Sequence, residues 1–317
     1  MVSCVAQIFL WSLMSFIAAA ILVYTFFYLY INYLRNRFIQ EFNSHLNEFC
    51  QNLGTVVYRS QVSIPYQNGV YEKSLALALL DIAFNVSNSN CQNILPLPNP
   101  PKFTQQLRIE GVQPISGDIV MFAYIFWDQT LQHACIAFTG TKFISEWQSD
   151  FQFEQVAPTV LNGYENGVLV HMGIYNIYLS IRDKLWNWWK SNQSWVKTLY
   201  ITGHSLGGGL STICSYDFAK VFTNNFPVHY SFAAPRTGNP DYAQLFNDRL
   251  PTSIRVNNTE DLIPQLPLAQ QKSYTYEQTG GNAPFTVSLG SLEENHIQAY
   301  QNYLPICPES VSCHVDS

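Results

Sequence analysis

Ser205 has the residue type and surroundings of a nucleophile. The segment YITGHSLGGGLS, residues 200–211, places it between glycines, after an apolar run and before a helical stretch. A serine hydroxyl attacks carbonyl groups poorly at neutral pH unless a base accepts its proton. Gly203, His204 and Gly207 complete a G-x-S-x-G pattern, which is typical of a sharp strand-to-helix turn that presents a nucleophile. This context favours a nucleophilic Ser205 over a serine that is only a small turn residue.

A nucleophilic serine needs a base and an acid that orients the base. In strand-turn-helix sites of this kind the order along the chain is serine, then Asp or Glu, then histidine. The order predicts His296, in SLEENHIQAYQNYL, as the base. Asp261 follows the predicted strand SIRVNN, and ligand-facing groups are expected at the carboxyl end of such a strand. Asp261 is therefore the predicted acid, with Glu260 as a possible substitute.

Attack on an ester leaves a negatively charged oxygen that needs preorganised donors. The backbone N–H of Leu206, directly after the serine, is one predicted donor. The segment IAFTGTK follows an earlier strand and offers Thr141, whose backbone N–H and hydroxyl could both face the site. Leu206 and Thr141 form the predicted oxyanion hole.

Short apolar runs alternate with helical stretches from about residue 119 onward. Several of the runs are apolar on both faces, which favours a mostly parallel sheet covered by helices on both sides. A further helix is predicted over residues 72–84, where the apolar positions follow a helical period. The sequence therefore predicts an α/β fold with a mostly parallel central sheet and helices on both faces.

The N-terminus carries a largely apolar run without charges from Val5 to Leu34, and the first charged residue is Arg35. This run exceeds the roughly 20 apolar residues that cross a bilayer, and it predicts a transmembrane or signal-anchor helix. A cleaved signal peptide, which would give a secreted protein, is the alternative. We expect a membrane or signal segment at 1–36, a connector at 37–70 and the α/β domain at 71–317.

Charge and cysteines give opposing indications of compartment. Arg35 and Arg37 follow the apolar run, and the positive-inside rule would keep the main domain cytosolic. The seven cysteines include Cys307 and Cys313 in the C-terminal tail, which could form disulfides in an oxidising compartment. We expect a single-pass protein of the secretory pathway or cell surface. The net charge of −6 makes nucleic acid an unlikely partner, and no cysteine spacing is typical of a zinc site.

Several ordered motifs together resemble the class 3, fungal-type lipase family of the α/β-hydrolase fold. They are AFTGT, EWQSD, VHMGIY, GHSLGG, FAAPRTGN and DLIPQLP, followed by His296 with Tyr300, and they extend over about residues 72–303. The resemblance implies the triad Ser205, Asp261 and His296, with the oxyanion hole at Thr141 and Leu206. Three positions depart from the family motifs, and they are Thr139, Glu146 and Ala234.

The resemblance implies a serine hydrolase that cleaves carboxylic esters of lipids through an acyl-enzyme. No metal or organic cofactor is implied, and the expected partners are a lipid ester and a membrane or lipid interface. The alternatives are a phospholipase A1, diacylglycerol lipase or acyltransferase on the same triad, a catalytically silent membrane-tethered lipid-binding protein, and a non-lipid esterase or peptidase. Residues 142–153 have apolar positions at helical spacing and are either a movable lid or a helix packed permanently on the domain.

Overall fold

The computed structural model divides the chain into two compact units, residues 1–53 and 54–317. It describes residues 21, 23–26, 28–30, 33, 71–92, 97–113, 117–140, 153–161, 165–219, 221, 227–307 and 314–315. In the first unit the described residues are helical and expose large apolar side chains such as Tyr24 and Phe26. No helix within the described residues is both long enough and apolar enough to span a bilayer. Most of the predicted 1–36 segment, and the whole 37–70 connector, lie outside the described residues.

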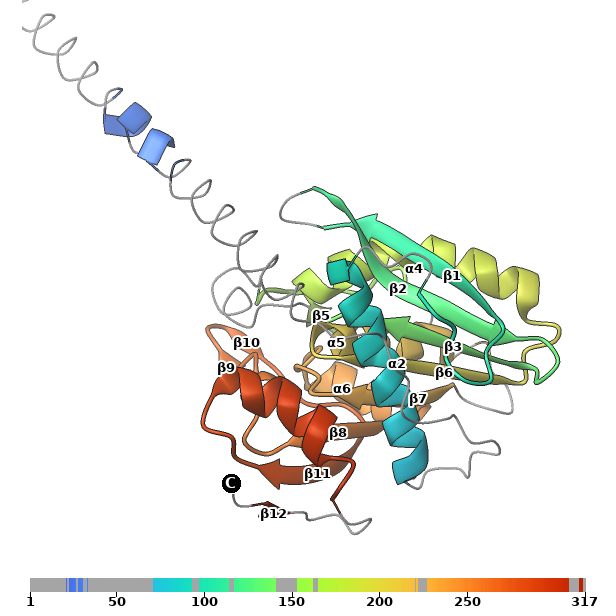
Figure 1. The fold of residues 1–317 in the computed structure, drawn as a ribbon. Helices are drawn as coiled ribbons and strands as arrows, with labels where there is room; N and C mark the ends of the chain where they lie inside the picture. Colours follow the sequence, from blue (N-terminus) through green and yellow to red (C-terminus); the bar gives the residue numbers. More distant parts are fainter. Residues whose placement is uncertain are drawn as a thin grey trace, which may run out of the picture. The chain divides into compact units, whose positions relative to one another are not determined.

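The second unit is built on an eight-stranded sheet with the strand order β1-β2-β3-β6-β7-β8-β11-β12 (Figure 1). The strands β1 to β3 pair antiparallel, and every later pairing in this sheet is parallel. The strands of the sheet are β1 (Gln105–Val112), β2 (Ile119–Asp128), β3 (His133–Phe138), β6 (Thr198–His204), β7 (Val228–Phe232), β8 (Ile254–Asn258), β11 (Gly281–Val287) and β12 (His314–Val315). The predicted mostly parallel sheet is confirmed.

Small two-stranded ribbons lie beside this sheet. They pair β4 (Gln155–Val156) with β5 (Val170–His171), and β9 (Gln270–Gln271) with β10 (Tyr274–Thr275). A short 3-10 helix, η1 (Ile263–Gln265), follows β8.

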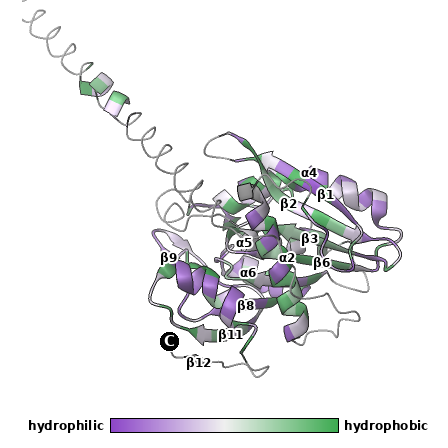
Figure 2. Ribbon diagram, viewed as in Figure 1, coloured by the Kyte–Doolittle hydropathy of each residue, from purple (hydrophilic) through white to green (hydrophobic). Residues whose placement is uncertain are grey.

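Helices cover both faces of the sheet, as the sequence predicts. One apolar cluster packs β2, β3 and β6 against α4 (Met172–Asn192), α5 (Leu206–Ala219) and α6 (Pro240–Arg249). The alternate residues of the same strands face α2 (Lys73–Gln92) and the π-helix η2 (Glu294–Tyr303). Figure 2 shows mainly hydrophobic residues along β3 and a mixture of hydrophilic and hydrophobic residues along α4. This alternation explains why central strands such as β3 have no exposed face.

The helix predicted over residues 72–84 is present but longer, since α2 continues to Gln92. Its apolar period weakens after Phe84, where polar side chains begin to donate to backbone carbonyls of the preceding turn. Asn85, Ser87 and Ser89 each make such a bond, to residues three or four positions earlier. Local side-chain bonds thus accompany the last turns of α2.

Candidate active site

Ser205 lies on the turn between β6 and α5, as predicted. Its φ is +60°, in the left-handed region that a residue with a side chain seldom adopts, and it is only 3% exposed. A Cβ on Gly203 would come within 2.1 Å of the Gly207 carbonyl oxygen. A Cβ on Gly207 would come within 2.5 Å of the Phe138 carbonyl oxygen. The two glycines are therefore required by close backbone contacts, and the turn holds Ser205 in a strained conformation.

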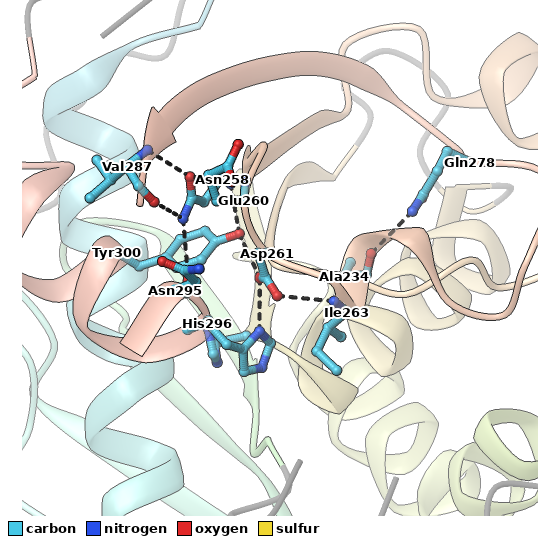
Figure 3. A network of polar contacts seen from close by, with 11 residues as sticks. Ala234, Asn258, Glu260, Asp261, Ile263, Gln278, Val287, Asn295, His296 and Tyr300 are labelled. Carbon is cyan, nitrogen blue, oxygen red and sulfur yellow. Dashed lines mark hydrogen bonds and ion pairs between the residues drawn. The ribbon is translucent and has the colours of Figure 1, made fainter. Parts of the chain in front are cut away.

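Asp261 and His296 come together although 35 residues separate them. The His296 Nδ1 lies 2.8 Å from Asp261 Oδ2, and both side chains are buried (Figure 3). Asp261 lies just beyond the carboxyl end of β8, and His296 is the third residue of η2. The other ring nitrogen, His296 Nε2, is buried and has no hydrogen-bond partner within the described part of the chain. The pair has the arrangement of a base whose far nitrogen is held by a carboxylate.

The Asp261 carboxylate accepts two further hydrogen bonds. The Tyr300 hydroxyl donates to Oδ2 at 3.0 Å, and the Ile263 N–H donates to Oδ1 at 3.0 Å. Burial and the Asp261 charge raise the pKa of Tyr300 well above its usual value, so the phenol keeps its proton and acts as a donor. His296 and Tyr300 are four residues apart on a π-helix, and both reach the same carboxylate. The carboxylate is thereby fixed from three directions.

Asn258 joins the strand that precedes Asp261 to the helix that carries His296. Its Nδ2 donates to the carbonyls of Val287 and Asn295, and its Oδ1 accepts from the Val287 N–H (Figure 3). Its own N–H donates to the Tyr300 hydroxyl at 2.8 Å. One buried asparagine therefore sets the positions of β8, β11 and η2 relative to one another.

His204, which precedes the serine, contacts the helix of the histidine directly. Its Nε2 lies 2.8 Å from the His296 carbonyl oxygen, and the two imidazole rings lie with their centroids 4.6 Å apart. Burial, and then the nearby His296, lower the pKa of His204 well below its usual value. A neutral His204 can therefore donate Nε2–H to this carbonyl. The contact brings the turn that carries Ser205 against the helix that carries His296.

The remaining predicted residues have different outcomes. Glu260, the substitute acid, is exposed to solvent, while its neighbour Asp261 is 1% exposed and faces His296. Leu206 is the first residue of α5, so its N–H is among those that a helix leaves without an intrahelical partner. Thr141 and almost all of the predicted lid at 142–153 lie outside the described residues. Leu206 therefore remains a predicted oxyanion donor that the geometry permits.

The sequence predicts His296 as the base, and it does not indicate the roles of Asn258 or Tyr300. The signal for Tyr300 was its spacing of four residues from His296, which brings both side chains to one face of η2. Asn258 is the last residue of β8, and nothing local distinguishes it from Asn257. In the described part of the chain, no group of three or more His, Cys, Asp or Glu side chains could hold a metal ion.

The proteins that are similar to this chain are lipases and phospholipases. Residues 135–271 match the model of the family described as lipase, class 3. The similar curated proteins include phospholipase A(1) DAD1, chloroplastic, of Arabidopsis thaliana, which is 29% identical over 147 residues, or 42% of this chain and 33% of that protein. The secreted mono- and diacylglycerol lipase 1 of Fusarium solani is 26% identical over 152 residues, or 46% of this chain and 42% of that protein. The chain thus spans about a third to two fifths of these relatives.

Solved structures agree on the fold. A triacylglycerol lipase described as having a serine protease triad at its catalytic centre aligns with a TM-score of 0.50 and 21% identity, over 64% of this chain and 77% of that one. A deletion mutant of the Rhizomucor miehei lipase propeptide complex aligns with the same score and identity, over 64% of both chains. Residues 135–271 thus resemble the class 3 lipase family, and the second unit has the α/β-hydrolase fold of these solved lipases.

Proposed function

We propose that this protein is a serine hydrolase that cleaves carboxylic ester bonds of lipids. The observation that carries the proposal is the buried Asp261–His296 pair, with Nδ1 and Oδ2 at 2.8 Å, next to the strained turn of Ser205. The free His296 Nε2 is the nitrogen that would take the serine proton. The match of residues 135–271 to the class 3 lipase family supports lipid esters as the substrate class.

The reaction follows from the roles of these groups. Ser205 Oγ attacks the ester carbonyl while its proton passes to His296 Nε2, and the Leu206 N–H donates to the developing oxyanion. The tetrahedral intermediate collapses, the C–O bond to the alcohol breaks, and His296 returns the proton to the leaving alcohol. Water then attacks the acyl-enzyme, with His296 acting as base and then as acid, and releases the fatty acid. The Asp261 carboxylate accepts from the Nδ1–H of His296 and so keeps this proton on Nδ1.

The names of the relatives support two substrate classes. One group is named as phospholipases A1, from Arabidopsis thaliana and Oryza sativa, and the Fusarium solani protein as a mono- and diacylglycerol lipase. We favour a glycerolipid ester as substrate. The sequence motifs suggest that this activity is that of a triacylglycerol lipase. Phospholipase A1, diacylglycerol lipase and acyltransferase activities are alternatives on the same triad.

We also propose that the catalytic domain lies outside the cytosol, anchored beside a membrane or secreted. Cys307 is disulfide-bonded, and its sulfur partner lies outside the described side chains. Disulfides persist in oxidising compartments and are rare in the cytosol. This observation outweighs the two arginines that follow the apolar run. Protease protection of the chain in sealed vesicles tests the proposal, and a domain digested from the cytosolic side would contradict it.

The function is tested by initial hydrolysis rates on emulsified triacylglycerol, diacylglycerol and phosphatidylcholine. We expect fatty acid release from at least one of these lipids by the wild-type chain and none above background by Ser205→Ala. Ser205 is small and lies in a turn, so the variant should keep its fold, which circular dichroism checks. A folded wild-type chain that releases no fatty acid in detergent would favour the silent lipid-binding protein.

A further inference from the structure

The segment that follows β3 is held by α2, the helix that precedes the sheet in the chain. Gly140 lies two residues beyond β3, and its N–H donates to Ser87 Oγ at 2.8 Å. Ser87 belongs to α2, which packs across β3, β6 and β7 (Figure 1). The Ser87 hydroxyl gives its own proton to the Ala83 carbonyl at 3.0 Å, so its lone pairs are left to accept from Gly140. The helix therefore fixes the direction of this acceptor.

Gly140 lies directly against the turn that carries the nucleophile. A Cβ built on Gly140 would come within 2.9 Å of the His204 carbonyl oxygen and 3.4 Å of Ser205 Cβ. The carbonyl of Gly140 is also held, because the Thr139 hydroxyl donates to it at 3.1 Å. Each of the two peptide groups that flank Gly140 is therefore fixed by one hydroxyl, and together they form a wall beside Ser205.

A second residue of α2 contacts the same turn. The ring of Phe84 lies with its centroid 4.5 Å from that of His204, one turn of helix before Ser87. The last turns of α2 thus contact both the residue before the nucleophile and the segment beside it. Because α2 precedes the sheet in the chain, these contacts are long-range, and Gly140 is 53 residues from Ser87.

We propose that Ser87 is a positioning residue for the reaction, which sets the Gly140 peptide beside Ser205 through its hydrogen bond to the Gly140 N–H. The inference rests on the proposed function. An ester carbonyl attacked by Ser205 must fit between the serine and neighbouring backbone, so a shift of the Gly140 peptide would misalign the reacting atoms. Misplacement of this kind lowers kcat more than it weakens substrate binding.

The test compares Ser87→Ala with Ser89→Ala in the full chain. The Ser89 hydroxyl, on the same helix, donates to the Val86 carbonyl and provides a matched control. Both variants lose a bond to the helix backbone, and only Ser87→Ala also loses the bond to Gly140. We expect Ser87→Ala to lower kcat about tenfold with little change in KM. A tenfold loss in kcat has the magnitude expected for the loss of one hydrogen bond. Ser87→Thr keeps the hydroxyl and should restore most of the rate.

The host should form disulfides but add no N-linked glycan, because Ser87 completes the sequon that begins at Asn85. Asn85 is 6% exposed and its Nδ2 donates to the Asp81 carbonyl, so the folded chain offers little access there. Without glycosylation, the two alanine variants differ in the side-chain contacts that they lose: Ser87→Ala loses the Gly140 N–H, and Ser89→Ala loses the Tyr124 hydroxyl.

Amide hydrogen exchange of the segment that contains Gly140 gives a readout that does not need activity. We expect faster exchange there in Ser87→Ala and unchanged exchange in Ser89→Ala. Equal kcat and equal exchange in the two alanine variants would overturn the inference while leaving the hydrolase intact. Absence of ester hydrolysis by the wild type would instead refute the proposed function. If Ser87→Ala then still showed faster amide exchange at the Gly140 segment, Ser87 would have a structural role only.

Discussion

Replacing Asp261 with asparagine isolates the role of its carboxylate in orienting His296. Three donors converge on this carboxylate: His296 Nδ1 and the Tyr300 hydroxyl on Oδ2, and the Ile263 N–H on Oδ1. An amide has one acceptor oxygen, so one of its two ends must present N–H groups instead.

The two orientations of the amide differ in cost. With its oxygen toward His296, its NH2 group faces the Ile263 N–H, and two donors are left opposed in a buried place. With its NH2 group toward His296, the oxygen still accepts from Ile263, and His296 Nδ1 can become an acceptor by moving its proton to Nε2. The second orientation avoids two opposed buried N–H donors, and its NH2 group can also donate to the Tyr300 hydroxyl, so it is the one we expect. It puts the proton on the nitrogen that should accept from Ser205.

The expected loss is therefore that of the wrong tautomer, about 10⁴-fold in kcat, or ~5.5 kcal/mol in the activation free energy. The assay is the initial rate on a water-soluble short-chain ester, for Asp261→Asn and for Glu260→Gln as control. Glu260 is exposed, so its variant should stay within about twofold of the wild type. A loss below about tenfold in Asp261→Asn, or an equal loss in Glu260→Gln, would refute this reasoning.

Three further predictions concern buried contacts around the site. Tyr300→Phe leaves the Asn258 N–H without its acceptor and Asp261 without one donor. We therefore expect a free energy of unfolding lower by ~1–3 kcal/mol in urea titrations, and a kcat about tenfold lower. An unchanged free energy of unfolding together with an unchanged kcat would contradict these roles. Gly207→Ala places a Cβ 2.5 Å from the Phe138 carbonyl oxygen, and we expect ~1–3 kcal/mol of destabilisation, whereas a wild-type melting temperature would show that the turn can relax. Burial lowers the pKa of His229 to about 3, so the unfolded chain binds the extra proton and stability falls as pH drops from about 6.5 toward 3. In urea titrations across this range His229→Gln should show a shallower fall, and slopes equal to those of the wild type would count against the assignment.

The parts of the site that depend on local order could be predicted from the sequence. The turn around Ser205 shows in its glycines, because close backbone contacts at Gly203 and Gly207 exclude a Cβ. The loop after β8 could be predicted to carry the acid, with Asp261 named first and Glu260 as its substitute. The structure decides between them, because it buries Asp261 and exposes Glu260. The position of a residue relative to the end of a strand depends on the local sequence, so it can be recognised in a single sequence.

The contacts that lock these residues together could not be predicted in the same way. Ser87 meets Gly140, and Asn258 meets η2, only after strands far apart in the chain have paired. The π-helical geometry that lets His296 and Tyr300 share one carboxylate leaves no clear mark in the spacing of apolar residues. The membrane segment at 1–36 remains a prediction.

The central claim is that Ser205 is an activated nucleophile, and the most direct measurement is covalent labelling by a fluorophosphonate. The full chain is labelled in detergent, digested and examined by mass spectrometry, with Ser205→Ala treated in parallel. We expect one adduct, on Ser205, that is absent from the variant and much slower to form in Asp261→Asn. A folded wild-type chain that stays unlabelled, or one labelled equally in Ser205→Ala, would contradict it.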